Sequence, residues 1–409
     1  MFKIFSILLL LILSPSLAAK TYDLKAARDV LNEYIKTGKL AGGVILVMKD
    51  GEKILHYAAG MQDVESGKPM NKDSLFRIAS QTKALTTVSV MILKERGLLK
   101  LTDPVSKYIP AFKKTTVLTI NKDESRKIEP ASREITIHDL MTHSSGISYG
   151  WGPNHKQWKK AGLLGGFFSD RDQTMAQVLA PIPSLPHKAQ PGTQYVYGYN
   201  TDLLGVIIKI VSGKSLKDFF ESEITGPLKM IDTHFYLPLD KADRLATVYN
   251  VTPSGLERAE DGSSARATYL SQGNYVHAPH KAFSGGGGLI STTDDYAVFL
   301  SMLENNGSLN GVTILSPASV AEMTQDQIPY IDTNWDGYGF GFTLEIADAG
   351  ADKGKTTEYG WGGAFHTSYY VRPEDNVVVV YMTQLTQHKK LKDWEEINAA
   401  IKMGLGIKP

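Results

Sequence analysis

Two stretches of β character, one near each end of the chain, enclose a long interior that has little of it. Residues 42–48 end in the apolar run Val-Ile-Leu-Val-Met, Asp50-Gly51 follows as a hairpin turn, and 53–59 returns as a second strand. Near the other end, three segments are rich in Val, Tyr and Phe, which favour strands: 338–346, 365–371 and 377–383. The pattern predicts one antiparallel sheet built from both ends of the chain.

The interior, from about residue 113 to 335, is rich in Pro, Gly and polar turns between short helical patterns. Apolar residues recur at helical spacing in seven segments of the chain: 24–38, 80–96, 135–142, 201–211, 216–224, 293–305 and 391–404. The prediction is therefore an α/β (α+β) fold whose sheet is flanked by helices. Its sheet region is residues 20–79 and 336–409, its mostly helical region is 80–335, and we expect the active-site cleft between the two.

Charge and composition exclude several classes of function. Among 409 residues, Lys plus Arg number 44 and Asp plus Glu number 43, and there is no long basic stripe, which argues against a nucleic-acid partner. There is no cysteine, so Cys nucleophiles, thiolate metal sites and disulfides are excluded.

The first residues have the pattern of a secretory signal. Lys3 precedes an almost unbroken apolar run over 4–13, and Ser16-Leu17-Ala18 places small residues where a signal peptidase reads. The alternative is a membrane anchor, but the run is short for a span of about 20 residues. We predict a signal peptide over 1–19, a periplasmic or secreted protein, and no stable membrane span after its removal.

Ser80-Gln81-Thr82-Lys83 contains the only serine in the chain that is followed by a lysine three residues later. If the segment is helical, residues at this spacing share a face and their side chains can meet. A serine hydroxyl needs a base, and a lysine acts as one only when burial or a nearby cation destabilises its ammonium form. The alternative is an N-cap serine with a surface lysine, but the following helix is apolar enough to be buried.

Other catalytic patterns are missing from the sequence. There is no G-x-S-x-G elbow and no H-E-x-x-H zinc motif. His277 and His280 are three residues apart but lie in a loop that contains proline, which makes them a poor metal pair. We expect no metal and no organic cofactor.

Five segments, in order, resemble the penicillin-recognising serine hydrolase family, on the branch of class C β-lactamases, D-alanyl-D-alanine carboxypeptidases and their esterase relatives. The segments are LFRIASQTKALT (75–86), ITIHDLMTHSSGISYG (135–150), PGTQYVYGYNTDLLG (191–205), FSGGGGLISTTDDYAVFL (283–300) and YGWGGAFHTSYYVRPE (359–374). The similarity extends from about Gly42 to Thr383. It implies a β-lactamase-like fold and an acyl-enzyme formed on Ser80, with Lys83 as a catalytic partner.

The resemblance also implies a catalytic phenol. The family's second motif, Tyr-x-Asn or Tyr-Ser-x, corresponds here to Tyr197-Gly198-Tyr199, followed by Asn200. A phenol beside a lysine can take a proton from the serine and return it to the leaving group. Packing is the alternative role, and it is the one expected for Tyr195 and Tyr199. Tyr199 stands where many relatives have Asn, so Asn200 is a candidate to replace that substrate contact.

The family's third motif corresponds to Trp361-Gly362-Gly363, as in the esterase-like members, rather than to Lys-Thr-Gly. Lys355-Thr356-Thr357 is a partial match that lacks the glycine. Two glycines would let substrate approach the strand, and the backbone N–H groups of Ser80 and Ala364 would form the oxyanion hole. The alternative is a strand-end bulge with a packed Trp. Without the motif's lysine, neutral acyl esters are favoured over carboxylate-bearing substrates, although His366 could supply part of a cation.

Two other matched segments are expected to be structural: a tight turn at 143–146 and close backbone packing at 285–288. The resulting prediction is a serine hydrolase, a carboxylesterase on small acyl esters, whose partner is a small-molecule acyl substrate. β-Lactamase and D-Ala-D-Ala carboxypeptidase activities use the same residues and remain alternatives. Acyl transfer to an alcohol and a non-catalytic binding protein with the same fold also stay open.

Overall fold

The computed structural model describes residues 22–121, 123–261, 271–277, 279–388 and 391–407. The predicted signal peptide, 1–19, lies outside these ranges. Within them, no helix is both long and apolar enough to cross a bilayer.

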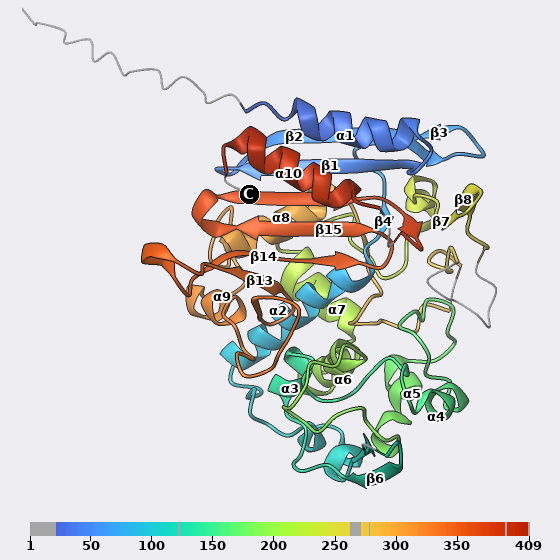
Figure 1. Cartoon of the computed structure of the whole chain (residues 1–409), viewed down its shortest axis with the longest axis vertical. Coiled ribbons are helices and arrows are strands. Elements are labelled where there is room, and N and C mark those ends of the chain that lie inside the picture. Colours follow the sequence, from blue (N-terminus) through green and yellow to red (C-terminus); the bar gives the residue numbers. More distant parts are fainter. Residues whose placement is uncertain (1–21, 122, 262–270, 278, 389–390, 408–409) are drawn as a thin grey trace, which may run out of the picture.

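One eight-stranded sheet contains strands from both ends of the chain, as the sequence predicts (Figure 1). Its order is β12-β13-β14-β15-β16-β1-β2-β3, and every neighbouring pair is antiparallel. The bounds are β1 Gly42–Lys49, β2 Glu52–Asp63, β3 Lys68–Pro69, β12 Gly337–Tyr338, β13 Thr343–Ile346, β14 Thr356–Gly363, β15 Thr367–Arg372 and β16 Val377–Met382.

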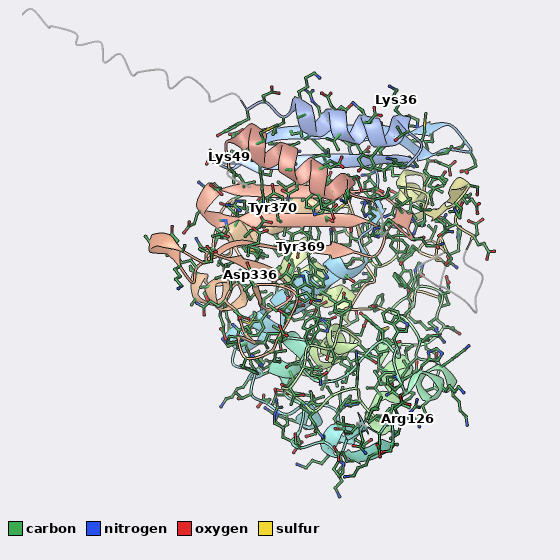
Figure 2. All side chains as sticks on the ribbon, in the orientation of Figure 1. Lys36, Lys49, Arg126, Asp336, Tyr369 and Tyr370 are labelled. Carbon is green, nitrogen blue, oxygen red and sulfur yellow. The ribbon has the colours of Figure 1, made fainter. Side chains whose placement is uncertain are left out.

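Helices cover both faces of this sheet because alternate strand residues point to opposite sides. On β16, Val377, Val379 and Tyr381 belong to a core cluster beneath α1 (Lys25–Lys36) and α10 (Asp393–Leu405). The residues between them face the larger core, which contains α2 (Thr82–Glu95) and α8 (Thr293–Glu304). Tyr369 and Tyr370 on β15, both labelled in Figure 2, divide between the two cores in the same way. We call the α1/α10 side the outer face and the α2/α8 side the inner face.

The remaining helices are short except for α6, and most lie below the sheet in Figure 1. Serine and threonine caps start several of them: Thr136 and Thr174 form capping boxes, and Ser215 and Thr292 accept a first-turn N–H. The bounds are α3 Ile137–Met141, α4 His155–Lys160, α5 Met175–Leu179, α6 Asn200–Ser212, α7 Leu216–Phe220 and α9 Pro317–Met323, with a π-helical turn, Glu221–Thr225, after α7.

The structure corrects the predicted strands in three respects. The single strand expected over 338–346 is two strands, β12 and β13, because the chain turns between them at Gly341, where φ is +93°. β14 was not expected, since its glycines break the apolar alternation. Four small pairings of strands were also missed: β4 (Phe76–Arg77) with β9 (Ile290–Ser291), β5 (Thr116–Ile120) with β6 (Arg126–Pro130), β10 (Ser308–Leu309) with β11 (Val312–Thr313), and β7 (Tyr249–Thr252) with β8 (Gly255–Arg258) and β17 (Leu385–Thr386).

The predicted division of the chain at residue 335 does not separate two bodies in space. α8 belongs to the interior of the sequence, yet it packs on β16 and β1 of the sheet. α8 buries nine of its residues, among them Tyr296, Phe299 and Leu300, so its long apolar face needs the sheet as a partner. The sheet region therefore includes one helix from the interior of the chain.

Candidate active site

Ser80 lies in a tight turn immediately before α2. Strand β4 pairs with β9, and the chain then forms a 3-10 turn over Ala79–Gln81. Ala79 has φ +44°, a left-handed conformation that is costly for a residue other than glycine. Such strain persists only where the surroundings impose it, and it is often found at functional sites. The turn places the Ser80 hydroxyl next to the first turn of α2.

Lys83 is fully buried in the first turn of α2, whose residues from Thr82 to Leu93 are all buried. Its Nζ donates to the Gly286 carbonyl oxygen at 2.6 Å and to the Ser80 Oγ at 3.3 Å. A third donation, at 3.3 Å, goes to the Tyr149 hydroxyl. The alternative of a surface lysine is therefore excluded, and the amine sits in a shell of neutral oxygen atoms.

Tyr197 approaches Ser80 from a different part of the chain. Its hydroxyl donates to the Ser80 Oγ at 2.7 Å. The Lys83 Nζ lies 4.6 Å from the centroid of the Tyr197 ring. An amine and a phenol thus both lie within hydrogen-bonding reach of one serine hydroxyl, which is the geometry of a serine nucleophile with two candidate proton-transfer groups.

Tyr149 is a site residue that sequence reasoning missed. It lies at the end of the matched segment 135–150, which was interpreted as structural. Burial raises the pKa of its hydroxyl well above the ordinary value of 10.0, so Tyr149 stays neutral as it accepts from the Lys83 Nζ. Its presence in a segment shared with the family was the available signal, but nothing in the local pattern indicates that Tyr149 points at Lys83.

Asp202 supports the site through the Gly286 peptide. Its Oδ1 accepts from the Gly286 N–H at 3.1 Å and from the Ser284 hydroxyl at 2.5 Å, while the Gly286 carbonyl accepts from Lys83. Burial raises the Asp202 pKa, although the Lys83 charge and these hydrogen bonds oppose the shift. A Cβ on residue 286 would collide with the carboxylate, so the predicted close packing of the glycine run is confirmed at this position.

His143 has φ +55°, within the segment expected to form a tight turn. Its buried ring lies 4.7 Å from the Tyr197 ring, and its Nδ1 pairs with the Asn200 amide nitrogen at 2.8 Å. Burial and the Lys83 charge hold the pKa of His143 well below its usual value. The imidazole is therefore neutral and forms one wall behind the catalytic phenol.

The C-terminal end of β14 lies against the turn that carries Ser80. A Cβ on Gly363 would overlap the Ile78 carbonyl oxygen and the Thr367 hydroxyl, so only glycine permits this approach. The Trp361 ring packs on the same side, 5.7 Å from the Tyr197 ring. β13 pairs with β14 only as far as Gly360, which leaves Trp361–Gly363 without a neighbour on that edge in the sheet. The assignment of Gly362 and Gly363 to substrate binding, and of the Ser80 and Ala364 amides to an oxyanion hole, remains a prediction.

Tyr199 packs in the core, as expected from the sequence, and neither Tyr199 nor Asn200, the candidate to replace it, is exposed to a substrate. Both are fully buried. The Tyr199 hydroxyl donates to the Gly165 carbonyl at 2.5 Å, and its ring packs against its aromatic neighbours, Tyr149, Trp158 and Phe168. The Asn200 amide bonds to Ser145 and His143. At the start of α6, Asn200 therefore holds the 143–147 turn and Tyr199 holds the chain at Gly165, instead of facing a ligand.

His366 is likewise wrongly predicted as a cation for substrate. Its Nε2 lies 2.8 Å from both carboxylate oxygens of Asp393, the first residue of α10. The Tyr381 hydroxyl donates to the same carboxylate at 2.6 Å. These groups belong to the outer face of the sheet, so the imidazole ties α10 down. Hydrogen bonding and the His366 charge lower the Asp393 pKa despite the burial of this carboxyl.

The chain is similar to known proteins over most of its length. The family model described as Beta-lactamase matches residues 27–402. Protein Rv1367c of Mycobacterium tuberculosis is 31% identical over 371 residues, which cover 87% of this chain and 88% of the relative. Esterase EstB of Burkholderia gladioli is 28% identical over 367 residues, covering 87% and 88% of the two chains.

Among solved structures, the chain is similar to EstCE1, described as a hydrolase with promiscuous acyltransferase activity. The two superpose with a TM-score of 0.75 at 26% identity, over 92% of this chain and 97% of EstCE1.

Among the described residues, no group of three or more His, Asp or Glu is arranged to hold a metal ion.

Proposed function

The chain belongs to the beta-lactamase family of serine hydrolases, and from that premise we propose that it is a carboxylesterase acting through an acyl-enzyme on Ser80. The observation that carries the proposal is the meeting of three side chains at one oxygen. The Ser80 Oγ accepts from Tyr197 at 2.7 Å and from Lys83 at 3.3 Å.

In the proposed reaction, the Ser80 Oγ attacks the acyl carbonyl carbon while its proton passes to the unprotonated Lys83 amine, which lies 3.3 Å away. The Lys83 Nζ also lies 4.6 Å from the centroid of the Tyr197 ring, so the phenol is beside the amine, and both contact the Ser80 Oγ. The same proton then goes to the leaving alcohol, and water repeats the sequence to release the acid. The amides of Ser80 and Ala364 are proposed to stabilise the oxyanion, where loss of one donor typically costs about 10²–10³ in rate.

The proposed substrates are small neutral acyl esters. A carboxylate-bearing substrate needs a cation near the end of β14, and three candidates do not provide one. Lys355 lies at the other end of this strand and pairs with Asp352, His366 pairs with Asp393, and Lys83 is buried against neutral oxygens. The name of the relative Esterase EstB supports an ester as the substrate.

The test compares p-nitrophenyl butyrate with nitrocefin on one preparation. We expect rapid hydrolysis of the ester, slow hydrolysis of the lactam, and loss of at least about 10³ in ester turnover in Ser80→Ala. Ser254→Ala, at the exposed turn between β7 and β8, is the matched control and should retain full activity. A fluorophosphonate probe should label Ser80. Fast lactam cleavage with an untouched ester would replace the esterase proposal with a β-lactamase.

Acyl transfer is a second candidate activity, because EstCE1 is described as having it and the acyl-enzyme is the same. Adding methanol to the ester assay separates the two: transfer yields the methyl ester in excess of free acid.

The sequence of residues 1–19 supports a further proposal, that the protein is exported to the periplasm or the medium. N-terminal sequencing of the protein recovered outside the cytoplasm should begin near residue 20.

A further inference from the structure

The segment from Leu140 to Ser169 contains no Asp or Glu, and it runs along one side of the proposed active site. Tyr149, within it, accepts from Lys83. Phe167, near its end, packs its ring 5.3 Å from that of Phe365, the neighbour of Ala364. Two residues of this segment therefore lie beside the proposed active site.

The short helix α4 presents lysines outward within this segment. Trp158 is its buried anchor, and the indole N–H donates to the Pro186 carbonyl at 3.3 Å. Lys156, Lys159 and Lys160, at positions i, i+3 and i+4, share the exposed face of the helix. None of the three forms an ion pair with a described residue, so their charges are not neutralised within the part of the fold that the structure covers.

Two large apolar side chains are exposed in the chain that flanks α4, one before the helix and one after it. Trp151 is 54% exposed and Leu164 is 43% exposed. The backbone holds them near each other: the Gly165 N–H donates to the Tyr149 carbonyl at 3.1 Å, and Gly150 packs so closely on the Leu163 carbonyl that a Cβ would not fit. We call the set Trp151, Lys156, Lys159, Lys160 and Leu164 the basic apolar patch.

We propose that the basic apolar patch docks the protein peripherally on the surface of an anionic lipid bilayer. Exposed Trp and Leu enter the headgroup boundary, and neighbouring lysines are attracted to anionic headgroups. A soluble polyanion would use the lysines alone and leave the apolar side chains in water, so the combination favours a bilayer. The proposal concerns binding and does not depend on the esterase activity.

The test measures binding of the protein to sedimented vesicles of phosphatidylcholine, with and without 30 mol% phosphatidylglycerol. Each lysine near an anionic surface contributes about five-fold to partitioning, so Lys156→Gln/Lys159→Gln/Lys160→Gln should weaken binding by about 100-fold. Trp151→Ser/Leu164→Ser should weaken it by at least about 10-fold. Repeating both series in Ser80→Ala separates docking from turnover, since binding should be the same there.

Matched control variants change the same number of exposed lysines and of exposed apolar side chains at other places on the protein surface. Lys36→Gln/Lys72→Gln/Lys209→Gln removes three exposed lysines that form no ion pair with a described residue, and Ile231→Ser/Leu239→Ser removes two exposed apolar side chains. Both controls should bind vesicles like the parent protein. Equal binding with and without phosphatidylglycerol would overturn the proposal, as would equal losses in the control variants. Loss of heparin binding in the lysine variant, with vesicle binding intact, would point to a soluble polyanion and also overturn it.

Discussion

Two buried lysines in different regions of the molecule have opposite surroundings. Lys402 in α10, on the outer face of the sheet, pairs with the Glu358 carboxylate at 2.9 Å and lies 3.8 Å from Glu345. Lys83, beneath the inner face, donates only to neutral oxygens of Ser80, Tyr149 and Gly286. A buried charge normally needs a counter-charge to offset its desolvation. The outer face provides one in direct contact, whereas at the site the Asp202 carboxyl is separated from Lys83 by the Gly286 peptide.

Two histidines repeat the contrast. His366 on the outer face contacts the Asp393 carboxylate, whereas His143 behind the catalytic phenol pairs with the Asn200 amide. The outer face thus compensates its buried polar groups with opposite charges, and the site region leaves them with neutral partners. The difference indicates that the outer-face groups hold the fold together, while those of the site are kept available for proton transfer.

The largest expected effect is on the rate in Lys83→Met. Methionine fills a similar volume without the amine, so ester turnover should fall by about 10³ while the unfolding free energy changes little. Turnover of p-nitrophenyl butyrate and urea unfolding of the same sample provide the two measurements. Retention of more than a tenth of the activity would remove Lys83 from the proton-transfer set.

Lys402→Met should show the reverse pattern. Glu358 would keep only Arg372, whose Nη1 lies 3.2 Å away, so we expect a loss of about 2–3 kcal/mol in unfolding free energy. Turnover per folded molecule should be unchanged, because α10 covers the outer face of the sheet. A large loss of turnover without destabilisation would break the distinction between the two regions.

His187, in the helical region, should make the protein sensitive to acid. Burial lowers its pKa from 6.5 to about 4, so the unfolded chain takes up a proton between these pH values and the folded chain does not. Stability should therefore fall as pH drops from about 6.5 to 4, by roughly 3 kcal/mol from this residue. Urea unfolding of His187→Gln across that range should show a shallower decline than the parent protein. Parallel curves for the two proteins would show that His187 is not the source.

The smallest effect is expected in Tyr149→Phe. Lys83 would lose one of three acceptors and keep the Gly286 carbonyl and the Ser80 Oγ, so kcat should fall about ten-fold with little change in KM. Tyr359→Phe is the matched control, because this buried phenol of β14 faces the core and not the reacting groups. An unchanged kcat in Tyr149→Phe would make its contact with Lys83 purely structural.

Predictions from sequence succeeded where the pattern is local. The β1–β2 hairpin follows from its turn residues, and α2 follows from its continuous apolar residues. They failed at β14, whose glycines break the alternation expected of a strand. Gly363 is needed there because it packs against the Ile78 carbonyl oxygen, just before Ser80 in the chain. They also failed for Asn200 and His366, since side-chain direction depends on which distant element offers a partner.

The amino-acid sequence by itself determined that Ser80 and Lys83 share a face, because a spacing of three residues on a helical turn brings side chains together wherever the helix lies. It also determined that the two chain ends form one sheet, since their apolar strands cannot be buried separately. Only the tertiary structure decided that Tyr149 and Gly286 accept hydrogen bonds from Lys83 and that His366 pairs with Asp393 on the outer face instead of lying at the site. Those contacts join residues far apart in the chain, and their geometry exists only after the sheet and the helices have packed.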